Sequence, residues 1–263
     1  MFKPAPGQAG KNVLVKIAEH LDTLRREGEL MAVAADRAGL AAAVPSCPAW
    51  QVKDLLRHTG YVHRWAARHI TEGPAEVIDG PSEAEILSGG AADEDLLGWF
   101  RAGHAALVET LASADPAVEC ATFMPAPTPL AFWTRRQAHE TAIHRADAEL
   151  AAGPVDGSAP RYPADFAADG IDELIMGFGQ RRKYQPSAGS DADAGLLRVI
   201  AADTGDAWSI GDGSDAGCTV SGSASSLYLY LWNRASADGA DITVTGDPAL
   251  LASWQSSVRI RWS

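Results

Sequence analysis

The sequence predicts an α+β protein, in which a four-helix bundle is followed by a small α+β domain. Three observations predict this class. Apolar residues mark three helical segments before about residue 114, and proline at the start with Gly-Pro at the end marks a fourth up to about residue 152. Short alternating runs, broken by Gly-Asp and Gly-Ser turns, follow between about residues 196 and 245. A length of 263 residues with 46% hydrophobic content favours two domains over one.

The first two predicted helices supply half of the bundle. The first covers residues 11–37 and ends before Gly39, and its apolar stripe consists of Val13, Ile17, Leu21, Leu24 and Leu30. The second follows a Pro-rich turn at residues 44–48 and runs to about Thr71, with an apolar face of Val52, Leu55, Val62 and Trp65. His58 falls within that second apolar face.

The other half of the bundle follows a predicted surface connection at residues 74–92, which is rich in Gly, Pro, Glu and Ser. A third helix is expected at residues 93–114, with apolar positions Leu96, Leu97, Phe100, Ala106, Val108 and Leu111. Pro125, Pro127 and Pro129 mark an extended entry to a fourth helix, which runs from Leu130 to about Ala152 and ends at Gly153-Pro154. Four such helices make a bundle.

The C-terminal part alternates strands with helices. A helix is predicted near residues 163–183, strands at 196–202, 206–210, 217–221 and 241–245, and further helices at 224–234 and near 248–257. The Gly-, Pro- and Ser-containing segment 153–160 is the expected linker. We therefore expect a helical domain over residues 1–152 and an α+β domain over residues 160–263.

Composition excludes several classes of partner. The formal net charge is -12 at pH 7, and both halves of the chain are net negative, so a nucleic-acid partner is not expected. No signal-peptide core and no apolar run of about 20 residues are present, so we expect a cytoplasmic protein that does not enter the membrane. The three cysteines form no CxxC pair, which fits reduced thiols. A monomer or small homo-oligomer is expected.

Candidate metal ligands occur in the fourth predicted helix. Glu140 and His144 are four residues apart and share one helical face with Trp133, Gln137 and Ala148, so this face should point into the bundle. Burying an unpaired carboxylate there would be costly, and a metal ion would remove that cost. His58, on a neighbouring helix, qualifies as a third ligand. A simple Glu-His hydrogen bond or an ordinary surface pair is the alternative interpretation.

The remaining histidines do not fit the same ion. His63 points about 140° away from His58 around the helix, and His69 lies roughly 16 Å further along it. His139 sits about 100° from Glu140, so we expect it to contact solvent or cap a polar cluster. His20 and His104 have no partner that the sequence identifies.

The chain contains two notable stretches, Val44-Pro-Ser-Cys-Pro-Ala-Trp-Gln-Val-Lys-Asp-Leu-Leu-Arg-His58 and Arg135-Arg-Gln-Ala-His-Glu-Thr-Ala-Ile-His-Arg-Ala-Asp-Ala-Glu149. Both resemble the signatures of mycothiol-dependent maleylpyruvate isomerases. The segments 222–234 and 244–247 resemble that family's sterol-carrier-like C-terminal domain. Ala49 departs from the family pattern, where a glycine is expected. The resemblance implies a DinB-like bundle, usually in an actinobacterial protein, in which His58, Glu140 and His144 bind a divalent metal. Zinc is expected, with nickel or iron left open.

A site with three protein ligands leaves one metal position open for a substrate. The resemblance implies that mycothiol, or a related low-molecular-weight thiol, binds there as a thiolate and attacks an electrophilic small molecule. The reaction would be cis-trans isomerisation of a maleylpyruvate-like acid or thiol S-transfer. Two alternatives stay open: a non-catalytic metal- or ligand-binding module, and a metal-dependent hydrolase that uses bound water.

Three further residues are weaker candidates. Arg234 resembles a family arginine suited to anchoring an anionic acid, although a surface arginine at a helix end is an equally good interpretation. Trp50 is a candidate for the mouth of the substrate or thiol pocket, or a packing anchor at the helix start. Cys47, just before Pro48, is a rival nucleophile, but no base for it is evident.

Overall fold

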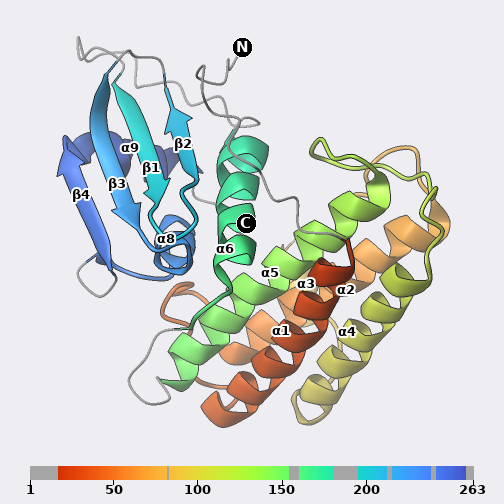
Figure 1. Ribbon diagram of the computed structural model, residues 1–263. Coiled ribbons are helices and arrows are strands. Elements are labelled where there is room, and N and C mark those ends of the chain that lie inside the picture. Colours follow the sequence, from red (N-terminus) through yellow and green to blue (C-terminus); the bar gives the residue numbers. More distant parts are fainter. Residues whose placement is uncertain are drawn as a thin grey trace. The chain divides into compact units, whose positions relative to one another are not determined.

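A computed structural model describes residues 17–81, 83–153, 160–179, 195–211, 215–237 and 241–258. The chain forms two compact units, one of residues 16–160 and one of residues 161–260, which we call the helical unit and the mixed unit. The helical unit is a bundle, and the mixed unit combines a four-stranded sheet with helices (Figure 1). The predicted α+β class is confirmed.

Four long helices build the helical unit: α1 (Ile17–Ala38), α2 (Val52–Glu72), α4 (Leu96–Ser113) and α5 (Pro129–Ala152). The short α3 (Glu83–Ser88) and the 3₁₀ turn η1 (Asp93–Asp95) lie between α2 and α4. Helix α1 packs mainly on α5 and also on α4, while α2 packs on α4 and α5. Each long helix therefore presents its inner face to at least two others, which is the geometry needed to converge side chains on one point.

The structure corrects three details of the predicted bundle. The segment predicted as a loop at residues 74–92 contains α3. Leu30 is 38% exposed, and Ala106 is also exposed. Each follows a buried residue, Leu24 and Phe100 respectively, by six positions, and six positions rotate an α-helix about 120° away from the apolar stripe. The predicted start of the first helix, including Val13, lies outside the described residues.

Helices α1 and α4 approach closely at Gly28. His104 on α4 donates a hydrogen bond from Nε2 to the backbone carbonyl of Leu24, 2.9 Å away. A Cβ atom at Gly28 would stand 2.2 Å from the same nitrogen, closer than any real contact. A glycine in the middle of α1 is therefore required by the imidazole that packs against it.

We expect Gly28→Ala to destabilise the helical unit by about 1–3 kcal/mol, because His104 must move and lose its bond to Leu24. Gly98→Ala is the matched control, since Gly98 lies in α4 with nothing within 4 Å of the added Cβ. Alanine there should stabilise the helix by roughly 0.5–1 kcal/mol. Urea unfolding followed by circular dichroism measures both changes. A Gly28→Ala variant as stable as Gly98→Ala would contradict this account of the contact.

The mixed unit contains a sheet with strand order β2-β1-β3-β4. Its strands are β1 (Leu196–Ala201), β2 (Ala207–Ile210), β3 (Ala216–Gly222) and β4 (Ile242–Gly246). Strand β1 pairs antiparallel with β2 and parallel with β3, and β3 pairs antiparallel with β4. Alternate residues such as Leu197, Val199 and Val220 are buried, as expected for strands with one covered face. The four predicted strands are confirmed.

Helices α6 (Ala164–Asp172), α8 (Ala224–Leu231) and α9 (Pro248–Val258) complete the mixed unit, and α6 continues into a π-helical turn, η2 (Glu173–Phe178). Helix α6 packs on α8, and both α8 and α9 contact β3. The helix predicted at 224–234 ends earlier, because Asn233 adopts a left-handed backbone with φ 63°. The end of the helix predicted near 163–183 and most of the predicted linker lie outside the described residues.

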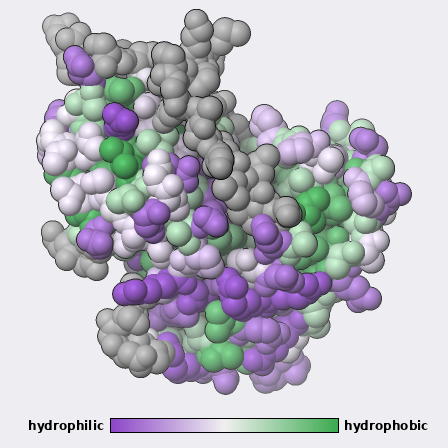
Figure 2. Space-filling model, in the orientation of Figure 1, coloured by the Kyte–Doolittle hydropathy of each residue, from purple (hydrophilic) through white to green (hydrophobic). Residues whose placement is uncertain are grey.

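The visible surface of the molecule is largely hydrophilic. On the face drawn in Figure 2, hydrophilic side chains cover much of the molecule and hydrophobic ones form small, separate patches. The large hydrophobic side chains that are exposed among the described residues are Leu30, Val33, Val77 and Met176. None of the described helices is both long and apolar enough to span a membrane.

Candidate metal centre

Two helices carry the predicted ligands, and each has a defined start. Helix α2 begins after Gln51, whose backbone N–H donates to the Asp54 carboxylate at 2.9 Å. Helix α5 begins with Thr128, whose hydroxyl oxygen accepts from the Ala131 N–H at 3.1 Å, and has Pro129 in its first turn. Such caps satisfy N–H groups that the helix itself leaves unpaired. The caps define the first residue of each helix and therefore the position of each ligand along the helix axis.

The three predicted ligands converge in the interior of the helical unit. His58 is 1% exposed, Glu140 4% and His144 2%. Glu140 Oε1 lies 3.4 Å from His58 Nε2 and 3.2 Å from His144 Nε2, and one ligand atom from each residue lies within 4.8 Å of the other two. Two ligands at zinc-ligand bond lengths with a tetrahedral angle between them are about 3.3 Å apart. The spacing fits a zinc ion; that an ion binds here stays a prediction.

Arg136 fixes the second oxygen of Glu140. Its Nη2 donates to Glu140 Oε2 at 2.6 Å, from one turn earlier on α5. Burial by itself would raise the pKa of Glu140, but Arg136, with further contributions from His144 and His58, holds that pKa well below its usual value. Glu140 is therefore an ionised carboxylate with Oε1 directed at the two imidazoles, which suits a ligand that binds through one oxygen.

A carboxylate behind His144 orients its ring. His144 Nδ1 donates to Asp147 Oδ2 at 2.8 Å, and the other oxygen of Asp147 accepts a hydrogen bond from the Ser46 hydroxyl. Burial lowers the pKa of His144, but the bonds to Asp147 and Glu140 outweigh it and the pKa is raised. Nε2 shares the second proton of the ring with Glu140 Oε1, and release of that proton would leave on Nε2 a lone pair that can bind a metal ion, while Asp147 keeps the proton at Nδ1. This arrangement is typical of metal-binding histidines.

Trp50 packs against both imidazoles of the site. Its ring centroid lies 4.9 Å from that of His58 and 6.3 Å from that of His144, and its side chain is 6% exposed. The His58 and His144 rings meet nearly edge to face, 5.0 Å apart. Trp50 thus restricts the rotation of both rings. Its predicted place at a pocket mouth stays a prediction.

The other histidines of α2 and α4 have separate partners. His63 Nε2 lies 2.9 Å from the Thr141 hydroxyl oxygen. His69 donates from Nδ1 to the Trp65 carbonyl and accepts at Nε2 from the Ile78 N–H. His104 bonds to a carbonyl of α1, a partner that the sequence did not identify. These contacts agree with the prediction that neither His63 nor His69 shares an ion with His58.

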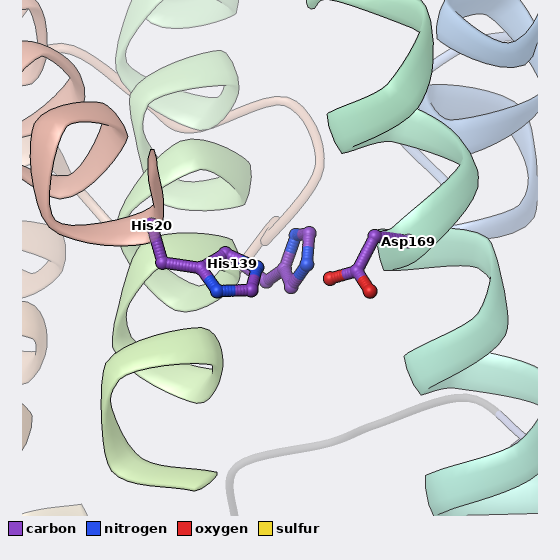
Figure 3. A group of neighbouring side chains, drawn as sticks. All are labelled: His20, His139 and Asp169. Atoms are coloured by element: carbon purple, nitrogen blue, oxygen red, sulfur yellow. The ribbon is translucent and has the colours of Figure 1, made fainter. Parts of the chain in front are cut away.

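His139 is completely buried, which rules out contact with solvent and leaves the other expectation, that it caps a polar cluster, as a prediction. Its ring lies 5.9 Å from that of His20, in a T-shaped arrangement. Figure 3 shows these two side chains extending from α5 and α1; the third residue labelled there, Asp169, belongs to α6 of the mixed unit. His20 therefore also has a neighbour that spacing along the chain could not reveal.

The other two weaker candidates, Arg234 and Cys47, occupy defined positions without an assigned role. Arg234 follows the end of α8 in the mixed unit, is half-buried, and donates from Nη1 to the Trp232 carbonyl at 2.7 Å. Cys47 is half-buried in the turn before α2, where its carbonyl accepts from the Trp50 N–H at 2.8 Å. Anchoring of a substrate by Arg234 stays a prediction.

Sequence reasoning missed Arg136, Asp147 and Ser46 as members of the site. Arg136 precedes Glu140 by four residues, and Asp147 follows His144 by three, so both spacings already indicate a shared helical face. Ser46 carries no such signal, because it lies 101 residues from Asp147 in the chain. Only the fold brings that turn to α5.

Two buried histidines make the stability of the helical unit depend on pH. Burial, then the neighbouring His104, holds the pKa of His63 well below its usual value, and burial lowers the pKa of His104. In the unfolded chain both titrate near about 6.5. Below that pH the unfolded chain takes up protons that the folded chain does not, so stability is retained above about 6.5 and lost as the pH falls.

We therefore expect the urea midpoint of the zinc-free protein to fall between about pH 7 and about pH 5, and to fall less steeply in His63→Met. The raised pKa of His144 acts in the opposite direction, since its contribution is present at low pH and lost as the pH rises. The His144 contribution is present in both the wild type and His63→Met. The difference between their slopes of urea midpoint against pH therefore reports the contribution of His63. Equal slopes would contradict a neutral, buried His63.

Comparison with known proteins agrees with these observations over most of the chain. Residues 21–149 match the model of the mycothiol maleylpyruvate isomerase N-terminal domain, and residues 165–253 match the model named MDMPI C-terminal domain. No curated protein matches the chain in sequence. The two family models together span both units, including every predicted metal ligand and Arg234.

Two solved structures share the fold. One is the crystal structure of a mycothiol-dependent maleylpyruvate isomerase, with 16% identity and a TM-score of 0.64, and the other is a histidine-to-alanine mutant of such an enzyme, with 17% identity and a TM-score of 0.66. Each comparison covers 88% of this chain and 93% of the other. At these identities the likeness establishes a shared fold. Together with the two family models, it shows that the chain belongs to the mycothiol-dependent maleylpyruvate isomerase family.

Proposed function

We propose that the chain is a zinc-dependent enzyme that binds a low-molecular-weight thiol, mycothiol, and directs its sulfur at an electrophilic small molecule. The observation that carries the proposal is the convergence of His58, Glu140 and His144 on one buried point. The same site is backed by hydrogen bonds to Arg136 and Asp147. The reaction that we propose first is cis-trans isomerisation of a maleylpyruvate-like acid, and thiol S-transfer is the alternative.

The donor set supports zinc as the ion. Two imidazoles and one carboxylate are common zinc ligands, and three protein ligands are typical of catalytic sites that keep a position open for substrate. Glu140 can offer only one oxygen, because Arg136 occupies the other at 2.6 Å. A bound zinc ion would supply a Lewis acid that lowers the pKa of a thiol and keeps its sulfur as the nucleophilic thiolate.

The residues of the chain prepare the site for that chemistry. Asp147 holds a proton of His144 at Nδ1, so that the lone pair of Nε2 is the one available to a metal ion. Arg136 keeps Glu140 ionised and balances its charge. Trp50 limits the motion of both imidazoles, and burial of all three ligands excludes bulk water. A preorganised and poorly hydrated site strengthens the interactions of any charged sulfur placed there.

The two proposed reactions share their first step. The thiolate of the cosubstrate forms a C–S bond at one carbon of the cis double bond, while the π electrons move onto the conjugated carbonyl oxygen as an enolate. The former double bond can then rotate. If the enolate returns its electrons and expels the thiolate, the trans isomer forms with no net redox change. If the adduct is protonated and retained, the outcome is S-transfer. Arg234 remains the proposed anchor for a substrate carboxylate.

Turnover measured with and without each component tests the proposal. Zinc-loaded protein is incubated with mycothiol and maleylpyruvate, and the alkene signals and the free thiol are followed by nuclear magnetic resonance. Isomerisation that requires both zinc and catalytic mycothiol is expected. Consumption of mycothiol would select S-transfer. Turnover undiminished without thiol would select a hydrolase, and binding of zinc and mycothiol without turnover would leave a binding module.

A further inference from the structure

Two polar atoms inside the helical unit lack a hydrogen-bond partner among the described residues. They are Nδ1 of His63 and Oε1 of Gln137. The side chains are 0% and 1% exposed, respectively. Leaving buried polar atoms unpaired is destabilising, and in folded proteins nearly all of them pair with protein or with ordered water. Two such atoms in one small bundle therefore point to a bound group that satisfies them.

The two residues come from neighbouring helices, and the contacts between these helices place them at similar levels. Helices α2 and α5 run antiparallel, because His58 meets Glu140 near the start of α2 whereas His69 meets Trp133 near its end. Between these contacts, His63 reaches Thr141 at 2.9 Å. Gln137 precedes Thr141 by four residues and Glu140 by three, so it shares their face of α5. Both unpartnered atoms thus lie in the layer next to the metal ligands.

The chemistry of the pair selects an uncharged ligand. His63 is neutral, because burial and the nearby His104 hold its pKa well below its usual value. Its ring also packs against His104 and Phe100, with centroids 5.5 and 5.6 Å away. A neutral imidazole and a neutral amide give a charged group no opposite charge. A hydroxyl, which donates one hydrogen bond and accepts others, satisfies both.

We propose that His63 and Gln137 form an internal hydroxyl-binding site between α2 and α5, filled either by a water molecule or by a hydroxyl group of the thiol cosubstrate. The second source rests on the proposed function, whereas the first does not. In either case the bound group, which is not part of the polypeptide, bridges His63 on α2 and Gln137 on α5 next to the layer of metal ligands. A buried water commonly makes about three hydrogen bonds of this kind.

Substitution of each side chain by methionine tests the site, because methionine approximates the size of both without their polar atoms. Full-length Gln137→Met, His63→Met and the double variant are compared with the wild type in two measurements. Amide hydrogen exchange without thiol gives the protection of α5. Calorimetry of the zinc-loaded proteins gives the dissociation constant for mycothiol. Thr134→Val is the matched control, since the Thr134 hydroxyl on α5 already donates to the Leu130 carbonyl at 2.7 Å.

If water fills the site, each single variant lowers the protection of α5 by about 5–100-fold, and the double variant loses little more than the larger single one. If the cosubstrate fills it, protection without thiol is unchanged or raised, since apolar groups replace unpaired polar ones. Mycothiol then binds about 5–50-fold more weakly, with zinc stoichiometry unchanged. The Thr134→Val control should not affect mycothiol binding or depend on residue 63.

Two results would overturn the site: independent, additive losses of protection, or unchanged protection together with unchanged mycothiol binding. A wild type that binds no mycothiol would count against the proposed function and against the cosubstrate as the source. Hydrogen exchange then decides alone, since coupled losses of protection would still establish the water-filled site and their absence would exclude it.

Discussion

Glu140→Gln is expected to abolish stoichiometric zinc binding. The substitution keeps the size of the side chain but replaces an anionic oxygen, 3.4 and 3.2 Å from the two imidazole nitrogens, with a neutral amide. Structural zinc sites with four ligands contribute roughly 10–16 kcal/mol, so losing one of three ligands should weaken binding by at least about 100–1,000-fold. Elemental mass spectrometry measures the zinc stoichiometry, and competition with a chelator measures the zinc affinity.

The control for this substitution is Glu29→Gln, which removes a carboxylate of the same helical unit from an exposed position. It should bind zinc like the wild type. Because Glu140→Gln also takes one partner from the buried Arg136, circular dichroism must first show that the variant is folded. A folded Glu140→Gln protein that retains one zinc ion per chain with unchanged affinity would exclude the proposed metal site.

Asp147→Asn is expected to weaken zinc binding by about 10–100-fold, the effect typical of removing a carboxylate that orients a metal-binding histidine. Asparagine can turn its NH₂ group toward His144 Nδ1, which would favour the tautomer whose proton sits on the ligand nitrogen. Ser46→Ala removes only the outer hydrogen bond and should have a smaller effect in the same direction. Chelator competition gives the affinities, and the absorption spectrum of the cobalt-substituted protein reports the ligand geometry.

Asp36→Asn serves as the control for Asp147→Asn, since Asp36 is exposed on α1. A purely structural role for Asp147 would lower stability while leaving the affinity and the cobalt spectrum of the folded protein as in the wild type. That result would reject its role in orienting His144. The graded response of Asp147→Asn and Ser46→Ala is what distinguishes a chain of hydrogen bonds from a single contact.

Local patterns determined much of the fold. Alternation between buried and exposed positions located β1 to β4 within about a residue at each end, because a strand with one covered face repeats every two residues. Helical periodicity located α1, α2 and α4, and failed where a residue was assigned to the stripe despite being about 120° away, as with Leu30. The proline at its start and Gly153-Pro154 at its end located α5. Local spacing also placed Glu140 and His144 on one face of α5.

Hydrophobic periodicity does not identify a buried face of α5, because this helix has no clear water-facing side. Arg136, His139, Arg145 and Asp147 are all buried, although they lie at different angles around its axis. Charged and polar residues there are held by specific partners, as Glu27 on α1 holds Arg145 at 3.0 Å. The sequence alone cannot identify such partners, since hydrophobic patterning distinguishes only apolar surroundings from water.

By itself, the sequence determined the α+β class, the order of helices and strands, the family signatures and the pairing of Glu140 with His144. Only the tertiary structure decided that His58, 82 residues from Glu140, meets it at 3.4 Å, that Ser46 reaches Asp147, and that His63 and Gln137 are each buried with one polar atom that lacks a partner among the described residues. The physical reason is the distance along the chain over which each effect acts. Backbone periodicity acts over one or two turns, whereas a metal site and its supporting hydrogen bonds depend on how separate helices pack.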